Sequence, residues 1–139
     1  MSSSGSRVTR RVLLVEDHPG NRELLLRLLE DFPVTTIVAS TAADAVRLAL
    51  TERPALILMD ILLAQGDGRE ATRQIRGMLP TARIPVLAIS ALALAGDRER
   101  CLAAGCTDYL SKPFTIRQFR EKVAALLPVA DPAEQRVSA

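Results

Sequence analysis

The chain is poor in the residues that build several common kinds of site. Its 139 residues include no tryptophan, one tyrosine, three phenylalanines, one histidine and two cysteines. So few aromatic rings give the bases of single-stranded nucleic acid no platform for stacking. Cys101 and Cys106, with His18 far away in sequence, are too few ligands for a zinc site. We therefore expect two free thiols, buried or half-buried, in a reducing cytoplasm.

Long apolar runs and an excess of one charge are also missing. No apolar run approaches the ~18 residues that a membrane-spanning helix needs, so we expect no membrane insertion. Residues 1–9 are serine-rich and lack the apolar core of a signal peptide, which predicts a disordered leader on a cytoplasmic protein. The net charge is only +2, with basic residues interspersed among acids, and this argues against nucleic acid as a direct partner.

The composition is that of one globular domain, because 48% of the residues are hydrophobic and 24% are charged. Short apolar strands alternate five times with amphipathic helices between residues 10 and 127, and residues 128–139 form a short polar tail. The expected strands are residues 10–15, 34–39, 55–59, 84–89 and 107–111. The expected helices are residues 21–31, a segment capped by Ser40 or Thr41, then 69–78, 95–104 and, after Thr115, 116–127. This alternation predicts a doubly wound α/β fold with a five-stranded parallel sheet.

Several of the expected strands lead directly into polar side chains. Asp60 follows the uninterrupted apolar third strand, Glu16 and Asp17 follow the first, and Ser90 follows the fourth. Because open α/β sheets place their chemistry at the C-terminal edge of the strands, we expect these groups to meet there. Carboxylates are suitable ligands for Mg²⁺, and a carboxylate can also accept a phosphoryl group. Lys112, after the fifth strand, would pair with a phosphoryl oxygen as a point charge.

The motifs that carry these residues resemble the receiver domain of bacterial two-component response regulators. The matching motifs are Val12-Leu-Leu-Val-Glu16-Asp17, Leu58-Met59-Asp60, Asp67-Gly68, Ser90-Ala91 and Ala104-Gly105-Cys-Thr-Asp-Tyr109-Leu-Ser-Lys112-Pro113-Phe114. They occur in the family's order and spacing over residues 10–127. The resemblance implies a flavodoxin-like (βα)5 fold with strand order 2-1-3-4-5. It also implies a stand-alone signalling module that is no conventional enzyme.

The resemblance implies an acceptor and a metal site. Asp60 would be the phosphoacceptor. Glu16, Asp17, Asp60 and the backbone carbonyl of Leu62 would bind Mg²⁺, with Mn²⁺ as an alternative and with Glu16 acting through water. Ser90 would contact the phosphoryl group.

Three further assignments at the fifth strand follow from the same resemblance. Lys112 would also contact the phosphoryl oxygens, and the Lys112–Pro113 peptide bond would be cis. Tyr109 would be the switch aromatic, which turns inward when Ser90 moves toward the phosphate.

The resemblance also implies partners and an output surface. A histidine kinase or a histidine phosphotransfer protein would supply the phosphoryl group. The face made by the fourth helix, fifth strand and fifth helix would dock an unidentified downstream protein, or join two copies of a monomer into a weak homodimer. Arg98, Arg100, Arg117 and Arg120 would line this face, although a simple solvated surface explains these arginines equally well.

The loop after Asp60 departs from the family pattern. Many members have a proline at the position of Ala64. Leu62 and Leu92 are apolar at two positions that tune the access of water in the family. We hypothesise that they exclude the attacking water and lengthen the life of the phosphorylated form.

Structural roles are open for each of these residues. Asp60 is alternatively a turn-forming or helix-capping aspartate. Glu16 and Asp17 are alternatively solvated loop acids, Ser90 a helix cap, Lys112 a surface lysine, Tyr109 a packing residue and His18 a loop residue. Three other functions compete with the phosphorylated module. They are an interaction scaffold that takes no phosphate, the N-terminal receiver of a longer regulator, and a Mg²⁺-dependent phosphatase. The phosphatase is disfavoured because Leu62 stands where such enzymes usually have a second acid.

Overall fold

The computed structural model describes residues 10–91 and 94–127, so the expected leader (1–9) and tail (128–139) lie outside the described residues. The elements are β1 (Arg10–Val15), α1 (Pro19–Leu29), β2 (Val34–Ala39), α2 (Ala42–Glu52), β3 (Leu56–Asp60), α3 (Gly68–Arg76), the 3-10 turn η1 (Leu79–Thr81), β4 (Val86–Ser90), α4 (Asp97–Ala103), β5 (Asp108–Ser111) and α5 (Ile116–Leu126). Strands and helices thus alternate along the described chain, as the sequence predicts.

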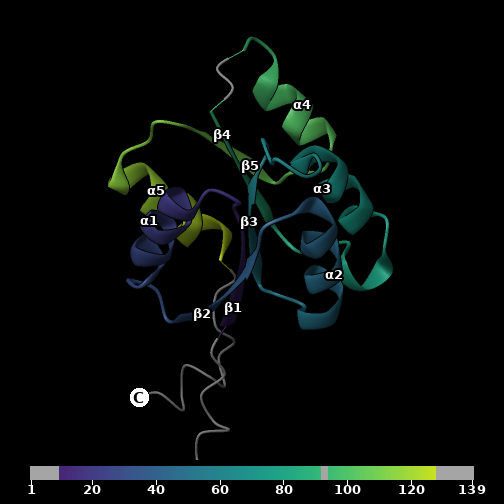
Figure 1. The fold of residues 1–139 in the computed structure, drawn as a ribbon, viewed down its shortest axis with the longest axis horizontal. Helices are drawn as coiled ribbons and strands as arrows, with labels where there is room; N and C mark the ends of the chain where they lie inside the picture. The colour runs from purple at the N-terminus through teal and green to yellow at the C-terminus, as the bar shows by residue number, and fades with distance from the viewer. Residues whose placement is uncertain (1–9, 92–93, 128–139) are drawn as a thin grey trace, which may run out of the picture.

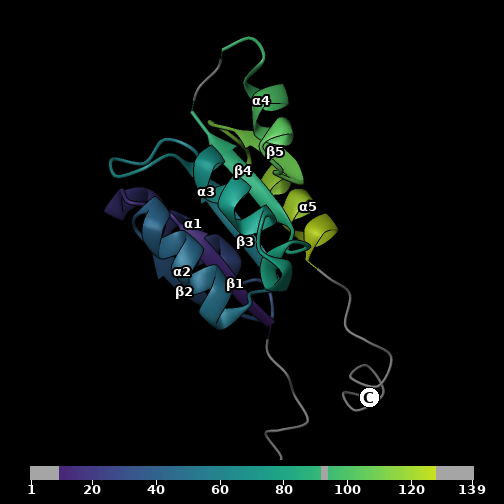
Figure 2. The same ribbon diagram turned by 90° about the vertical axis from the view of Figure 1, so that its right-hand side faces the viewer.

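The strands form one parallel sheet in the order β2-β1-β3-β4-β5, which confirms the predicted fold class. Helices α1 and α5 cover one face, and α2, α3 and α4 cover the other (Figure 1). Figure 2 turns the face with α2, α3 and α4 toward the viewer. All the strands run the same way, so their C-terminal ends meet at one edge of the sheet.

The uninterrupted apolar run of β3 is explained by burial on both faces of the sheet. Leu56 and Leu58 pack into the core under α1 and α5, whereas Ile57 and Met59 pack into the core under α2, α3 and α4. Because successive side chains of a strand point to opposite faces, a strand covered on both sides needs apolar residues throughout. β3 lies at the centre of the sheet and is the most completely buried strand together with β4.

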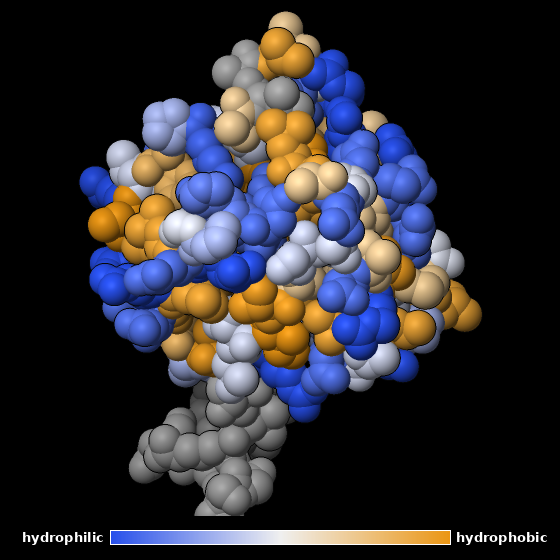
Figure 3. Space-filling model, in the orientation of Figure 1, coloured by the Kyte–Doolittle hydropathy of each residue, from blue (hydrophilic) through white to orange (hydrophobic). Residues whose placement is uncertain are grey.

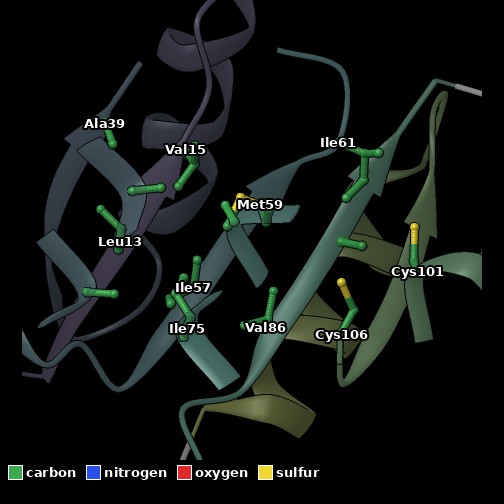
Figure 4. Close-up of a cluster of buried hydrophobic side chains, with 14 residues drawn as sticks. Leu13, Val15, Ala39, Ile57, Met59, Ile61, Ile75, Val86, Cys101 and Cys106 are labelled. Atoms are coloured by element: carbon green, nitrogen blue, oxygen red, sulfur yellow. The ribbon is translucent and has the colours of Figure 1, made fainter. Parts of the chain in front are cut away.

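Cys101 and Cys106 are free, buried thiols, as predicted. Both lie in the core under α2, α3 and α4 (Figure 4). Burial is the main cause that raises the pKa of the Cys101 thiol to about 11. Thiols with raised pKa values carry little reactive thiolate, so a packing role fits both residues.

Two strands extend one residue further than hydrophobicity alone predicts. The expected third and fourth strands end at residues 59 and 89, but β3 includes Asp60 and β4 includes Ser90. Asp60 is the register partner of Ile89, and Ser90 is the register partner of Ser111. Backbone pairing with the neighbouring strand therefore continues through the polar residues, and the two functional candidates belong to the sheet.

Helix starts follow their caps more closely than the apolar periodicity. α1 begins at Pro19, two residues before the predicted start, because the Nδ1 atom of His18 accepts a hydrogen bond from the amide of Asn21 (3.2 Å). Proline is well suited to the first position of a helix. α5 begins after Thr115, as predicted, and a capping box between Thr115 and Gln118 fixes that start.

Hydrophilic and hydrophobic residues are interspersed over the face of the molecule shown in Figure 3. None of the helices in the described part of the chain combines the length and the apolar character that a membrane crossing requires.

Arg76, at the end of α3, joins three segments that are distant in sequence. Its Nη1 donates to the carbonyl oxygen of Ile84 (2.6 Å), its Nε to that of Gly105 (2.8 Å) and its Nη2 to the hydroxyl of Thr107 (3.2 Å). The planar guanidinium thus connects α3 to the start of β4 and to the turn before β5. This contact holds the N-terminal ends of β4 and β5 in place.

Substituting Arg76 with alanine is expected to lower the free energy of unfolding by about 2–4 kcal/mol, because charge-assisted hydrogen bonds to partly buried carbonyls are lost. Arg76→Lys should recover only part of this, since an ammonium cannot reproduce the fork of donors. Arg73→Ala, on the same helix but exposed and paired with the exposed Glu70, should change stability by less than about 0.5 kcal/mol. Urea denaturation followed by circular dichroism measures all three, and equal losses for Arg76→Ala and Arg73→Ala would contradict this role.

Candidate functional site

The predicted site residues gather at the C-terminal edge of the sheet. Glu16 directly follows β1, Asp60 and Ser90 are the last residues of β3 and β4, and Lys112 directly follows β5. Backbone hydrogen bonds continue across this edge. The amide of Glu16 donates to the carbonyl oxygen of Ala39 (3.0 Å), and the amide of Lys112 donates to the carbonyl oxygen of Ser90 (2.8 Å). Strand pairing therefore brings together residues that lie up to 96 positions apart in sequence.

Three carboxylates converge at this edge. Glu16, Asp17 and Asp60 each offer an oxygen atom, and these atoms lie within 4.8 Å of one another. Glu16 and Asp60 are buried, while Asp17 is partly exposed. A set of hard oxygen donors that is open to solvent on one side suits Mg²⁺, which binds a few carboxylates and keeps several water ligands. The residues present thus fit a divalent cation.

Glu16 is held by two partners although only 1% of its surface is exposed. Its Oε1 lies 3.5 Å from the Nζ of Lys112, and its Oε2 accepts a hydrogen bond from the amide of His18 (3.1 Å). The ammonium of Lys112 thus lies against Glu16, and its positive charge also acts on Asp60. It offsets part of their mutual repulsion, which is severe for like charges at short range in a partly buried site.

The Asp60 carboxyl is oriented by the loop that follows it. Its Oδ1 accepts a hydrogen bond from the amide of Leu62 (3.1 Å). Burial first, and then the charge of Glu16, raise the pKa of Asp60 to about 7, against the lowering effects of Lys112 and of the Leu62 amide. Because the pKa of Asp60 is raised, a cation bound nearby would favour the ionised form of this carboxyl at neutral pH.

Two further features determine the path of the same loop. Asp17 accepts a hydrogen bond at Oδ2 from the amide of Ala64 (2.6 Å). At Gly68, a Cβ atom would lie 2.4 Å from the carbonyl oxygen of Asp60, so only glycine allows α3 to begin this close to the end of β3. Leu62 is half-exposed, and Leu92 lies outside the described residues.

Ser90 and Tyr109 lie beside the acidic cluster on the β5 side. Ser90 is fully buried, and Tyr109 is partly buried against the core under α2, α3 and α4. The Tyr109 hydroxyl donates a hydrogen bond to Oδ2 of Asp97. Burial, followed by this bond, raises the pKa of Tyr109 to about 12, while the Ser90 hydroxyl acts in the opposite direction.

Asp97 is a buried acid that sequence reasoning did not single out. It is the first residue of α4, and only 2% of its surface is exposed. Its sequence neighbours, Gly96 and Arg98, are both exposed, so nothing in the local pattern marks it as buried. Its contact with Tyr109 joins residues twelve positions apart and follows only from the packing of α4 on β5.

His18 and the Lys112–Pro113 peptide bond lie next to the acids and lysine of the site. His18 caps α1 and is exposed, which is a structural role. The Lys112–Pro113 peptide bond is cis.

Three of the four arginines expected on the face of α4, β5 and α5 pair with acids, whereas Arg100 donates a hydrogen bond to the carbonyl oxygen of Ala95 (3.4 Å). Arg98 lies 3.5 Å from Asp108, Arg117 lies 3.4 Å from Glu121, and Arg120 pairs with Asp31.

Comparison with known proteins gives a consistent result. The family described as "Response regulator receiver domain" matches residues 12–124. The polar-differentiation response regulator DivK of Brucella ovis is 37% identical over 120 residues, which are 86% of this chain and 98% of DivK.

Solved structures agree. The receiver domain of the sensor histidine kinase PA1611 from Pseudomonas aeruginosa has a magnesium ion coordinated in its active-site cleft. It is 38% identical, with a TM-score of 0.79, over 86% of this chain and 98% of that one. The receiver domain of a signal transduction histidine kinase from Syntrophus aciditrophicus is 31% identical, with a TM-score of 0.78, over 86% of this chain and 90% of that one.

Replacing Asp60 with asparagine is expected to stabilise the metal-free protein at neutral pH by about 1–2 kcal/mol, a value discounted for solvent access to the site. The folded-state pKa of about 7 lies above the ordinary value of 3.8, so ionisation of Asp60 disfavours the folded state. The gain should be complete above pH 7 and should vanish as the pH falls toward about 4.

Urea denaturation in the presence of a chelator, at several pH values, measures this gain. Asp67→Asn is the matched control, because Asp67 is an exposed helix cap outside the cluster and asparagine caps equally well. Mg²⁺ should stabilise the wild type more than Asp60→Asn. If Asp60→Asn is no more stable than the wild type above pH 7, ionisation of Asp60 does not lower the free energy of unfolding, and the prediction is wrong.

Proposed function

The chain belongs to the response regulator receiver domain family and is a phosphoacceptor signalling domain rather than a conventional enzyme, and from this we propose that Asp60 accepts the phosphoryl group. The observation that carries the proposal is the convergence of Glu16, Asp17 and Asp60 at the sheet edge, with Lys112 paired to Glu16. Asp60 is the acid of this cluster that belongs to a strand, and its orientation is set by the Leu62 amide.

Phosphoryl transfer to Asp60 requires an ionised, correctly placed carboxylate. In the proposed step, a carboxylate oxygen of Asp60 forms a bond to phosphorus while the bond between phosphorus and the donor nitrogen of a phosphohistidine breaks. The electron pair of that bond stays with the leaving imidazole, which takes up a proton. The product is an acyl phosphate on Asp60. Positioning and electrostatics supply most of the rate in such a transfer.

The remaining site residues stabilise the transferred group in this proposal. Lys112 leaves its long 3.5 Å contact with Glu16 and pairs with one phosphoryl oxygen. Ser90, at the end of the neighbouring strand, donates a hydrogen bond to another. Tyr109 then responds to the movement of Ser90.

A divalent cation is the proposed cofactor, with Mg²⁺ preferred and Mn²⁺ as an alternative. Glu16 through water, Asp17, Asp60 and the backbone carbonyl of Leu62 would hold it. When bound, such a cation supplies positive charge that offsets the negative charge of the phosphoryl group. The tight clustering of oxygen donors and the raised pKa of Asp60 both support this assignment.

Receiver domains take their phosphoryl group from histidine kinases, and we propose a histidine kinase or a histidine phosphotransfer protein as the direct donor here. The proposed setting is the cytoplasm. The face of α4, β5 and α5 is the proposed output surface, for a downstream protein or for a weak homodimer, and Ile116 supplies an exposed apolar contact there.

The acceptor is tested with the purified protein, acetyl phosphate and Mg²⁺. Intact mass spectrometry should detect one added phosphoryl group on the wild type and on Asp67→Asn, but none on Asp60→Asn or after chelation of the metal. The exposed Asp67 serves as the control because it lies near the site but outside the acid cluster.

An adduct that persists in Asp60→Asn would assign the acceptor to another residue. If the wild type gains no adduct and also fails to bind beryllofluoride with Mg²⁺, an interaction scaffold that takes no phosphate becomes the better description.

A further inference from the structure

Asp97 is a buried carboxylate whose hydrogen bonding is incomplete. Its Oδ2 accepts the hydrogen bond of Tyr109, and its Oδ1 is buried with no hydrogen-bond partner among the described residues. A buried carboxylate is costly unless it is paired, so the hydroxyl of Tyr109 is a strongly held partner. This pair lies at the junction of α4 and β5, outside the acid cluster.

The chemistry of the pair fixes the direction of its hydrogen bonds. A carboxylate can only accept hydrogen bonds, and a phenol has one proton to donate. Tyr109 therefore donates its hydroxyl proton to Asp97. The Ser90 hydroxyl interacts with the phenol oxygen, which can then only accept a hydrogen bond from it. Ser90 also has a single proton. The proton of Ser90 is therefore directed toward Tyr109 and not toward Asp60.

We propose that Asp97 is a positioning residue for phosphoryl acceptance: acting through Tyr109, it holds the hydroxyl proton of Ser90 away from the phosphoryl pocket. This inference rests on the proposed function of Asp60. A phosphoryl group on Asp60 competes with Tyr109 for the one proton of Ser90. Asp97 thereby weakens phosphoryl binding and couples it to α4.

A second contact connects the same two elements. Arg98, next to Asp97 on α4, lies 3.5 Å from Asp108, which is next to Tyr109 on β5. Two adjacent residues of α4 are thus paired with two adjacent residues of β5. When Ser90 turns toward the phosphoryl group, the change at Tyr109 reaches α4 through Asp97. This arrangement links the occupancy of the pocket to the proposed output face.

The pair can be observed directly, because Tyr109 is the single tyrosine and the chain has no tryptophan. Intrinsic fluorescence therefore reports Tyr109 alone. A phenol bonded to a carboxylate loses its proton to that carboxylate in the excited state and emits weakly. We expect the unliganded wild type to emit less than Asp97→Asn. Glu99→Gln, which removes an exposed acid from the same first turn of α4, should emit like the wild type.

Calorimetric titration with beryllofluoride and Mg²⁺ measures the effect on the site. Asp97→Asn and Tyr109→Phe should each bind beryllofluoride about threefold to tenfold more tightly than the wild type, the effect of one net hydrogen bond. The double variant should bind no more tightly than either single variant, since both remove the same contact. Glu99→Gln should bind like the wild type. Tyr109→Phe keeps the ring and carries the test if Asp97→Asn folds poorly.

The outcomes separate this inference from the proposed function. Equal emission of the wild type and Asp97→Asn, unchanged or weaker beryllofluoride binding in both variants, or additive effects in the double variant would overturn the role of Asp97. In each of those cases wild-type binding of beryllofluoride still supports the phosphoacceptor. A wild type that fails to bind beryllofluoride overturns the proposed function and this inference with it.

Discussion

Parallel pairing of β1 with β3, and of β3 with β4, holds mutually repelling carboxylates at one edge of the sheet. Glu16, directly after β1, and Asp60, the last residue of β3, are buried there because the ends of these two strands are covered on both faces. The backbone hydrogen bonds of the sheet and its apolar cores outweigh the repulsion. The acids cannot move apart without breaking strand register, and the site therefore keeps a strong demand for positive charge.

The need of the acid cluster for positive charge affects both the stability of the fold and its capacity for phosphoryl transfer. An acid cluster that destabilises the metal-free fold is also one that attracts a cation, and the cation offsets the charge of an incoming phosphoryl group. Lys112 satisfies the demand only in part, because its contact with Glu16 is long and its side chain remains partly exposed. The residues that make the site costly in isolation are thus the ones that make it suited to phosphoryl transfer.

The site also extends beyond the acids. Ser90 ends β4 beside the acids and interacts with the Tyr109 hydroxyl, which in turn donates a hydrogen bond to Asp97. Each of these hydroxyls has one proton, so a change in one hydrogen bond forces a change in the next. In such a chain, an acid at the start of α4 is able to influence a carboxylate at the end of β3 without touching it.

Patterns in the amino-acid sequence are sufficient to predict the fold class, the order of the elements and the identity of the clustered acids. Doubly buried strands need uninterrupted apolar runs, and β3 with Asp60 at its end has a pattern that few other arrangements produce. The helix start after Thr115 is equally predictable, since a capping box depends on residues only three positions apart. Hydrophobicity alone places the ends of the third and fourth strands one residue too early, before Asp60 and Ser90, because pairing with a neighbouring strand decides where a strand ends.

The partners of these groups, in contrast, depend on the packing of the folded chain. The contact of Lys112 with Glu16, the hold of Asp17 on the Ala64 amide and the burial of Asp97 against Tyr109 all join segments far apart in sequence. No periodicity or motif encodes such contacts, because they depend on how helices pack on the sheet. For the same reason, the raised pKa of Asp60 follows from burial and neighbouring charge and not from the residue type.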